Sequence, residues 1–204
     1  MTKKKKLVTV WGSLGIAAVL GFSALAYFAA KDNEPNLVGV GEDSITITES
    51  FTPPDQTQPY KKVVKITNTG SVPCYVRARI EFSDSEMLKK AEFSYADPDS
   101  AVAPAENTFH PADPDAEGSY VQHLPEKWIY NAADGYYYYT DKVGVSDATS
   151  TLLAWVKMNH GTDEKAEAHD IYVYSESVQT IDPKTGEAYT GYLDAWTKFT
   201  AETT

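Results

Sequence analysis

Residues 74–82, with the sequence CYVRARIEF, decide the fold class of this chain. Every second position carries a small or apolar side chain: Cys74, Val76, Ala78, Ile80 and Phe82. The positions between them carry Tyr or charged side chains: Tyr75, Arg77, Arg79 and Glu81. This period of two predicts a β-strand with one face in a hydrophobic core. On that face we expect Cys74 to be a small buried hydrophobe, with a reactive or crosslinking thiol as the less favoured alternative.

The same alternation recurs before and after this segment. Further strands are predicted over residues 44–51, 60–68, 127–131, 136–140, 151–159 and 169–180. An Asp134-Gly135 turn between two aromatic runs is typical of a β-hairpin. Short helices are predicted over residues 85–93 and 192–199. The expected fold is therefore all-β, an antiparallel jelly-roll-like β-sandwich with one or two short helices, formed by residues 44–204 as a single domain.

Composition and charge exclude several classes of function. The 204 residues are 42% hydrophobic and 23% charged, which is typical of a globular protein. Four of the 18 Lys and Arg lie in residues 3–6, which leaves 14 against 29 acidic residues and a net charge of −15 for residues 31–204. This charge argues against a nucleic-acid partner. The single cysteine excludes an intramolecular disulfide and any zinc or iron–sulfur site built from cysteines.

The N-terminus has the pattern of an export signal. Four lysines precede an uncharged run over residues 7–30. Ala24 and Ala26 fit the small-x-small rule of signal peptidase, so residues 1–26 are a predicted signal peptide cleaved before Tyr27. The alternative is an uncleaved hydrophobic helix that anchors the chain in the membrane up to about residue 30. Both interpretations place the rest of the chain outside the cytoplasm, secreted or at the cell surface.

Two polar segments accompany the predicted domain. Residues 27–43 are expected to form a flexible N-terminal arm, and residues 97–119 an acidic, Pro-rich loop or surface insertion. Two Asp-Pro-Asp motifs in the insertion offer carboxylates to calcium. The candidate ligands are Asp97, Asp99, Asp113 and Asp115. A hydrated acidic loop without metal is the favoured interpretation, because the spacing is not that of an EF-hand.

No catalytic motif is recognisable, so we expect a protein that is not an enzyme and has no cofactor. The four histidines lack the His-Glu-x-x-His spacing of zinc peptidases: His110, His123, His160 and His169. The sequence contains no nucleophile elbow and no phosphate-binding glycine loop.

Four consecutive tyrosines form the most aromatic segment, and alternation places two on each face of their predicted strand. They are Tyr136, Tyr137, Tyr138 and Tyr139. One pair is expected in the core, and the other pair is a possible exposed surface for sugars or a protein partner. Core packing of the segment is the favoured interpretation.

Several segments together resemble the TasA/camelysin family of exported proteins from Gram-positive bacteria, which a SipW-type signal peptidase processes. They are Ala26-Tyr27-Phe28, residues 36–41 (NLVGVG), residues 65–70 (KITNTG), residues 75–79 (YVRAR), residues 134–139 (DGYYYY), residues 170–173 (DIYV) with Val178-Gln179, and Ala195-Trp196. These segments span most of the chain in the family's order. The segment 97–119 does not match the family pattern.

The resemblance implies a secreted jelly-roll protein that assembles into fibres of a biofilm matrix. In such fibres the N-terminal arm of one subunit adds as a strand to the next subunit. The implied partners are other copies of the chain, the signal peptidase during export and other matrix components, with membrane contact only through an uncleaved N-terminal segment.

Residues 37–51 are the candidate donor strand. Its apolar positions are Leu37, Val38, Val40, Ile45 and Ile47. For residues 45–51 the favoured alternative is that they form the first strand of their own domain, whereas for residues 37–40 both alternatives stay open. Two other functions remain alternatives: a monomeric extracellular module that binds glycan or calcium, and a camelysin-like metallopeptidase, although the chain has no zinc signature.

Overall fold

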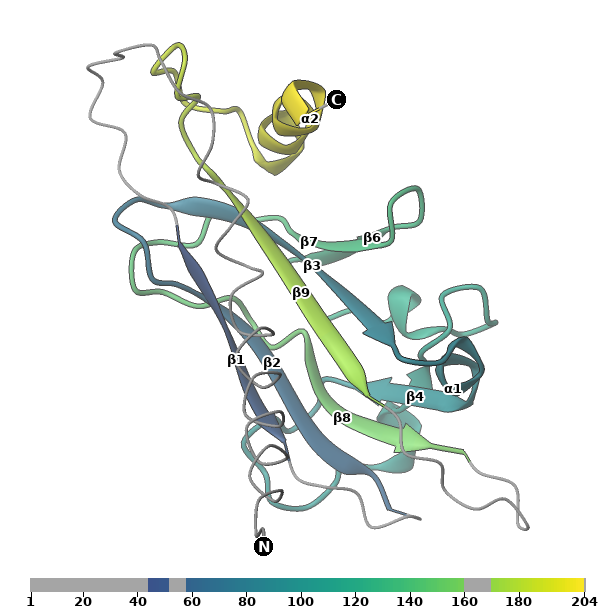
Figure 1. Ribbon diagram of the computed structural model, residues 1–204. Coiled ribbons are helices and arrows are strands. Elements are labelled where there is room, and N and C mark those ends of the chain that lie inside the picture. Colours follow the sequence, from purple (N-terminus) through teal and green to yellow (C-terminus); the bar gives the residue numbers. More distant parts are fainter. Residues whose placement is uncertain (1–43, 52–57, 160–169, 204) are drawn as a thin grey trace, which may run out of the picture. The chain divides into compact units, whose positions relative to one another are not determined.

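The computed structural model describes residues 44–51, 58–159 and 170–203, which form two antiparallel sheets packed as a sandwich (Figure 1). The predicted signal peptide and its cleavage site, the arm at residues 27–43 and the donor positions Leu37, Val38 and Val40 lie outside the described residues. Within the described residues, none of the helices is both long and apolar enough to cross a membrane.

One sheet has five strands in the order β1-β2-β8-β4-β5. Their bounds are β1 Ile45–Phe51, β2 Tyr60–Asn68, β4 Ala91–Ser94, β5 His110–Pro111 and β8 Leu153–Met158. The predicted alternation is clearest in β2, where every second side chain is buried. β1 pairs with β2 along all seven of its residues.

The other sheet has four strands in the order β6-β7-β3-β9. Their bounds are β3 Cys74–Phe82, β6 Trp128–Asn131, β7 Tyr136–Tyr139 and β9 Ile171–Gln179. The longest pairing joins β3 to β9, from Cys74 opposite Gln179 to Phe82 opposite Ile171. The predicted hairpin is confirmed in β6 and β7, and Gly135 supplies its turn with a φ of +74°.

The hydrophobic core lies between the sheets. Phe93 is 1% exposed, stacks on Phe82 and meets the edge of Tyr120, which is fully buried. The Tyr120 hydroxyl donates a hydrogen bond to the backbone carbonyl of Leu152. Cys74 is fully buried in the same core, as the alternation predicted.

The helix predicted over residues 85–93 is too long. The structure has helix α1 over Ser85–Lys90, with Asp84 as its N-cap through a 2.8 Å bond from the backbone N–H of Glu86. β4 begins directly afterwards, and its Phe93 pairs with Val156 of β8. Packing of Phe93 against the aromatic core therefore outweighs the helical pattern.

The strand near residue 153 differs from its prediction in one respect. We expected its side chains to alternate between a core face and an outer face, but every residue from Leu152 to Val156 is buried. β8 is a central strand whose pairing with β2 shifts register between Lys61 and Val64. Its outer face is covered by Phe109, which packs with Trp155.

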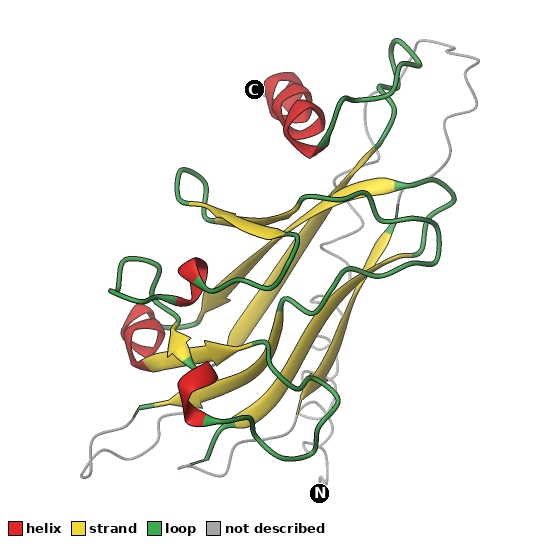
Figure 2. Ribbon diagram, turned by 180° about the vertical axis from the view of Figure 1, so that it is seen from behind, coloured by secondary structure: helices red, strands yellow, loops and turns green. Residues whose placement is uncertain are grey.

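The acidic segment at residues 97–119 is more than a surface insertion, although most of it is loop (Figure 2). Phe109 and Ala112 are buried, and the short strand β5 pairs with β4 at the sheet edge. Pro111 is tolerated there because an edge strand does not need all its N–H groups for pairing. Two 3₁₀ turns flank β5, at Glu106–Thr108 and Tyr120–Gln122.

Candidate functional site

The C-terminal helix α2, Tyr192–Thr203, covers one end of the outer face of the four-stranded sheet (Figure 1). Its apolar side chains recur at helical spacing on one side: Tyr192, Ala195, Trp196 and Phe199. They pack against Tyr75, Tyr138 and Val178 of the sheet. Helix and sheet thus form a second hydrophobic cluster outside the main core.

Arg77 of β3 lies at the centre of this contact. Its guanidinium carbon is 4.1 Å from the centre of the Tyr136 ring and 4.3 Å from that of Trp196. Pairing of β3 with its neighbours places Arg77 opposite Tyr138 of β7 and Glu176 of β9. The name Arg77 cluster is used below for Arg77 and the side chains around it: Asp134, Tyr136, Tyr138, Glu176 and Trp196.

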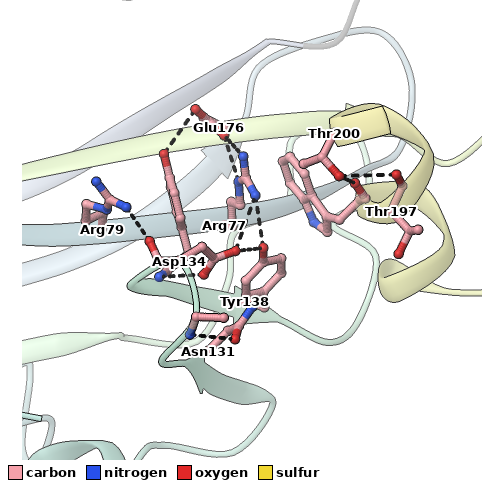
Figure 3. Close-up of polar contacts among 11 residues, drawn as sticks. Arg77, Arg79, Asn131, Asp134, Tyr138, Glu176, Thr197 and Thr200 are labelled. Carbon is pink, nitrogen blue, oxygen red and sulfur yellow. Dashed lines mark hydrogen bonds and ion pairs between the residues drawn. The ribbon is translucent and has the colours of Figure 1, made fainter. Parts of the chain in front are cut away.

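Hydrogen bonds complete the Arg77 cluster (Figure 3). Nε and Nη2 of Arg77 contact Oε2 of Glu176 at 2.7 and 2.6 Å. Nη1 donates to the Tyr138 hydroxyl at 2.9 Å, and this hydroxyl donates to Oδ2 of Asp134 at 2.6 Å. The cluster joins a turn and three strands of the sheet to α2 through Trp196.

The pKa shifts of Arg77, Tyr136 and Tyr138 all stabilise the ordinary charge states of these side chains at neutral pH. Burial opposes the charge of Arg77, but its hydrogen bonds to Tyr138 and Glu176 outweigh burial and raise its pKa. Burial, with a hydrogen bond to Asp134, raises the pKa of Tyr138, and burial with the charge of Glu176 raises that of Tyr136. At neutral pH the cluster therefore holds a charged guanidinium and neutral phenols, which suits the docking of a helix.

The tyrosine segment at residues 136–139 does not form an exposed platform. Tyr137 and Tyr139 are buried in the main core, and Tyr138 is 6% exposed because α2 covers it. Tyr136 is half-buried beside Arg77. The favoured interpretation of core packing is thus confirmed for Tyr137 and Tyr139, and the alternative of an exposed pair considered the strand without the helix that packs on it.

Two tyrosines that sequence reasoning missed are exposed instead. Tyr172 and Tyr174 of β9 are 45% and 51% exposed on the outer face of the four-stranded sheet. The alternation in residues 171–179 could have predicted this exposure, because Tyr172 and Tyr174 lie on the opposite face of the strand from Ile171 and Val173.

The structure does not assemble a calcium site from the candidate aspartates. In the described part of the chain, no group of three or more His, Cys, Asp or Glu side chains is placed to hold a metal ion. Oδ1 of Asp113 accepts a hydrogen bond from the backbone N–H of Asp115 at 3.1 Å. The backbone carbonyl of Asp97 accepts one from the Trp155 indole at 3.3 Å, and Asp99 lies exposed in the same loop.

His110 and His123 stack face to face, although sequence reasoning gave them no role. Their ring centres are 3.7 Å apart, and the rings are nearly parallel at 8°. Burial lowers the pKa of His110, and the neighbouring His123 lowers it further, whereas the charge of Glu92 acts in the opposite direction. The other two histidines, His160 and His169, lie outside the described residues.

We expect the stacked pair to make the protein less stable in mild acid. Because the pKa of His110 is lower in the folded than in the unfolded state, the stabilisation is complete above the unfolded value of about 6.5 and is lost as the pH falls below it. Urea unfolding at about pH 7.5 and about pH 5.5 should show a larger loss for the wild type than for His110→Gln. Equal losses in both proteins would contradict the prediction.

The donor candidates Ile45 and Ile47 lie in β1 and pack against the main core. In the single chain they thus belong to the domain's own first strand, as the favoured alternative predicted. β1 and β9 are outer strands of their sheets and lie near each other on one side of the sandwich. Among the described residues, nothing pairs with the free edge of either strand.

The sequence matches no protein-family model and no curated protein. The function therefore has to be inferred from the residues and their geometry.

Proposed function

We propose that the chain is an exported structural protein of the cell surface or biofilm matrix, and that it self-assembles into fibres by donation of its N-terminal strand. The finer description of the sandwich as a jelly roll belongs to the same proposal. The resemblance of several segments to the TasA/camelysin family supports it. In this proposal the signal peptidase releases the chain outside the cell, and its main partner is another copy of itself.

The observation that carries the proposal is the position of β1. It is an outer strand of the five-stranded sheet, and residues 27–43 precede it directly. An outer strand presents unpaired N–H and C=O groups to which an extended segment of another chain can bind. Leu37, Val38 and Val40 supply apolar side chains for such a segment, and Val38 and Val40 would lie on the same face of it.

The charge of the chain sets the conditions for assembly. Residues 31–204 carry a net charge of −15, from 14 Lys and Arg against 29 Asp and Glu. Like charges oppose association until protonation or salt reduces them. Assembly is therefore expected to increase as the pH falls toward the pKa range of the carboxylates, about 4.

The proposal is tested on residues 27–204 and on a shorter chain, residues 44–204, that retains every described strand. Both are examined by size-exclusion chromatography with light scattering and by negative-stain electron microscopy, at neutral and acidic pH. Filaments are expected from the longer chain and monomers from the shorter one. A longer chain that stays monomeric under all conditions, or equal filaments from both chains, would overturn the proposal.

Substitutions within the arm test whether filaments depend on its apolar side chains or only on its length. Serine at Leu37, Val38 and Val40 is expected to abolish filaments, because the apolar side chains can no longer fill pockets of the accepting subunit. Serine at Asn33 and Asn36 keeps the same arm length and should leave filaments intact.

A further inference from the structure

The part of the outer sheet face that α2 leaves uncovered combines exposed aromatic rings with acidic side chains. Tyr172 and Tyr174 project from β9, and their ring centres are 6.5 Å apart. On the adjacent strand β3, Glu81 lies opposite Tyr172, and Arg79 lies opposite Tyr174. We call this surface, including Asp170, the β9 tyrosine face.

The β9 tyrosine face carries negative charge beside its rings. Glu81 contacts Nη1 of the partly exposed Arg79 at 3.2 Å, which leaves this pair neutral. Asp170 accepts a hydrogen bond from the Tyr172 hydroxyl at 3.3 Å, and among the described residues no Lys, Arg or His pairs with its carboxylate. The net charge beside the two rings is therefore negative, in agreement with the charge of the whole exported part.

The Arg77 cluster and its neighbours hold this surface in place from one side. The Arg79 guanidinium carbon is 4.6 Å from the centre of the Tyr136 ring, and Nη2 of Arg79 donates to the backbone carbonyl of Asp134. Figure 3 shows Arg79 beside Asp134 of the Arg77 cluster. β9, which carries both tyrosines, is also paired with β3 along nine residues. The rings therefore stand on a sheet and not on a loop.

We infer that the β9 tyrosine face binds a polysaccharide of hexose units that carry free, protonated amino groups. The apolar faces of the sugar rings stack on Tyr172 and Tyr174, and the ammonium groups bind the Asp170 carboxylate and the electron-rich faces of the tyrosine rings. Charge complementarity favours this ligand over a polyanion, such as a nucleic acid, which the negative surface repels. The inference does not depend on fibre formation.

Three soluble hexamers with the same cellulose-type backbone test the inference, because they differ only in one substituent on each ring. They are the hexamers of glucosamine, N-acetylglucosamine and glucose. Binding to residues 44–204, the shorter chain that is expected to stay monomeric and that retains every described strand, is measured by isothermal titration calorimetry at about pH 6, where Asp and Glu side chains are ionised. Light scattering confirms that the sample is monomeric, so a failure of self-assembly does not affect the result.

Saturable binding of the glucosamine hexamer is expected, with at least about tenfold weaker binding of the other two. Added salt should weaken it, because ion pairing at an exposed surface is screened. Absence of saturable binding, or equal affinity for all three hexamers, would overturn the inference.

Variants place the binding on the named residues. Tyr174→Ala should weaken binding of the glucosamine hexamer about tenfold, and Asp170→Asn should weaken it and reduce its salt dependence. Tyr174→Phe keeps the ring and should bind nearly as well as the wild type. The matched control is Tyr95→Ala, which removes a tyrosine that is 40% exposed after β4 in the other sheet. Unchanged binding in Tyr174→Ala, or an equal loss in Tyr95→Ala, would contradict the assignment.

Discussion

Replacement of Trp196 by alanine is expected to release α2 from the four-stranded sheet and to lower the free energy of unfolding by about 3–5 kcal/mol. The indole is 3% exposed, and its ring meets the edges of Tyr138 and Phe199 at centre distances of 6.0 and 5.5 Å. It also covers the guanidinium of Arg77. A helix of 12 residues is marginal by itself in water, so its structure depends on this packing.

The indole N–H of Trp196 contributes no hydrogen bond that the substitution would break, because Nε1 is buried without a hydrogen-bond partner. Trp196→Ala therefore leaves no acceptor unpaired, and its cost arises from lost packing. Trp196→Phe keeps an aromatic ring and removes the unpaired donor, so it should lose clearly less stability than Trp196→Ala.

Urea unfolding measures the loss, and amide hydrogen exchange shows whether α2 has separated from the sheet. Leu193→Ala is the matched control, because Leu193 lies in the same helix and is 62% exposed. It should change stability by less than about 0.5 kcal/mol. If Trp196→Ala is as stable as Leu193→Ala, α2 does not depend on Trp196 for docking.

Replacement of Arg77 by methionine is the second change with a large expected effect, a loss of about 3 kcal/mol. Methionine keeps much of the length but leaves Glu176, Asp134 and the Tyr138 hydroxyl without their cation. The side chain of Glu176 is 39% exposed, so water stabilises it in part, and the loss should lie at the low end of the range for buried ion pairs. Arg77→Lys should lose less, because it keeps the charge without the planar, forked guanidinium.

Two further variants test the cause of this loss by urea unfolding. Glu176→Gln combined with Arg77→Met should recover part of the stability, because the uncompensated carboxylate is then removed. Arg79→Met is the control on the same strand, where the side chain is 37% exposed, and it should cost no more than about 1 kcal/mol. A loss in Arg77→Met no larger than in Arg79→Met would contradict the assigned role of Arg77.

The failures of sequence-based prediction share one physical cause. Residues 85–93 have a helical pattern, yet Phe93 belongs to a strand because the aromatic core accepts its ring there. The prolines of residues 97–119 predict a loop, yet Phe109 is buried because it covers the outer face of β8. In both segments, contacts with residues distant in the sequence outweigh the local pattern.

The candidate site was predictable only in part. The alternation of β3 correctly places Cys74 and Arg77 on opposite faces of the strand. The Asp134-Gly135 turn correctly predicts the hairpin of β6 and β7. The alternation does not predict that Arg77 is buried, since a charged residue on the polar face of a strand is ordinarily solvated. For the tyrosines at residues 136–139 core packing was the favoured interpretation, and the position of α2 excludes the alternative of an exposed pair.

The sequence by itself determined the strands other than β4 and β5, the hairpin of β6 and β7 and the mostly β architecture, because a period of two and a turn at Asp134-Gly135 are local properties of neighbouring residues. Only the tertiary structure decided which outer faces are covered. Trp196 reaches Arg77 from the far end of the chain, while Tyr172 and Tyr174 remain exposed beyond the helix. Burial of a strand's second face depends on the element that packs on it, and the pattern within the strand contains no information about that element.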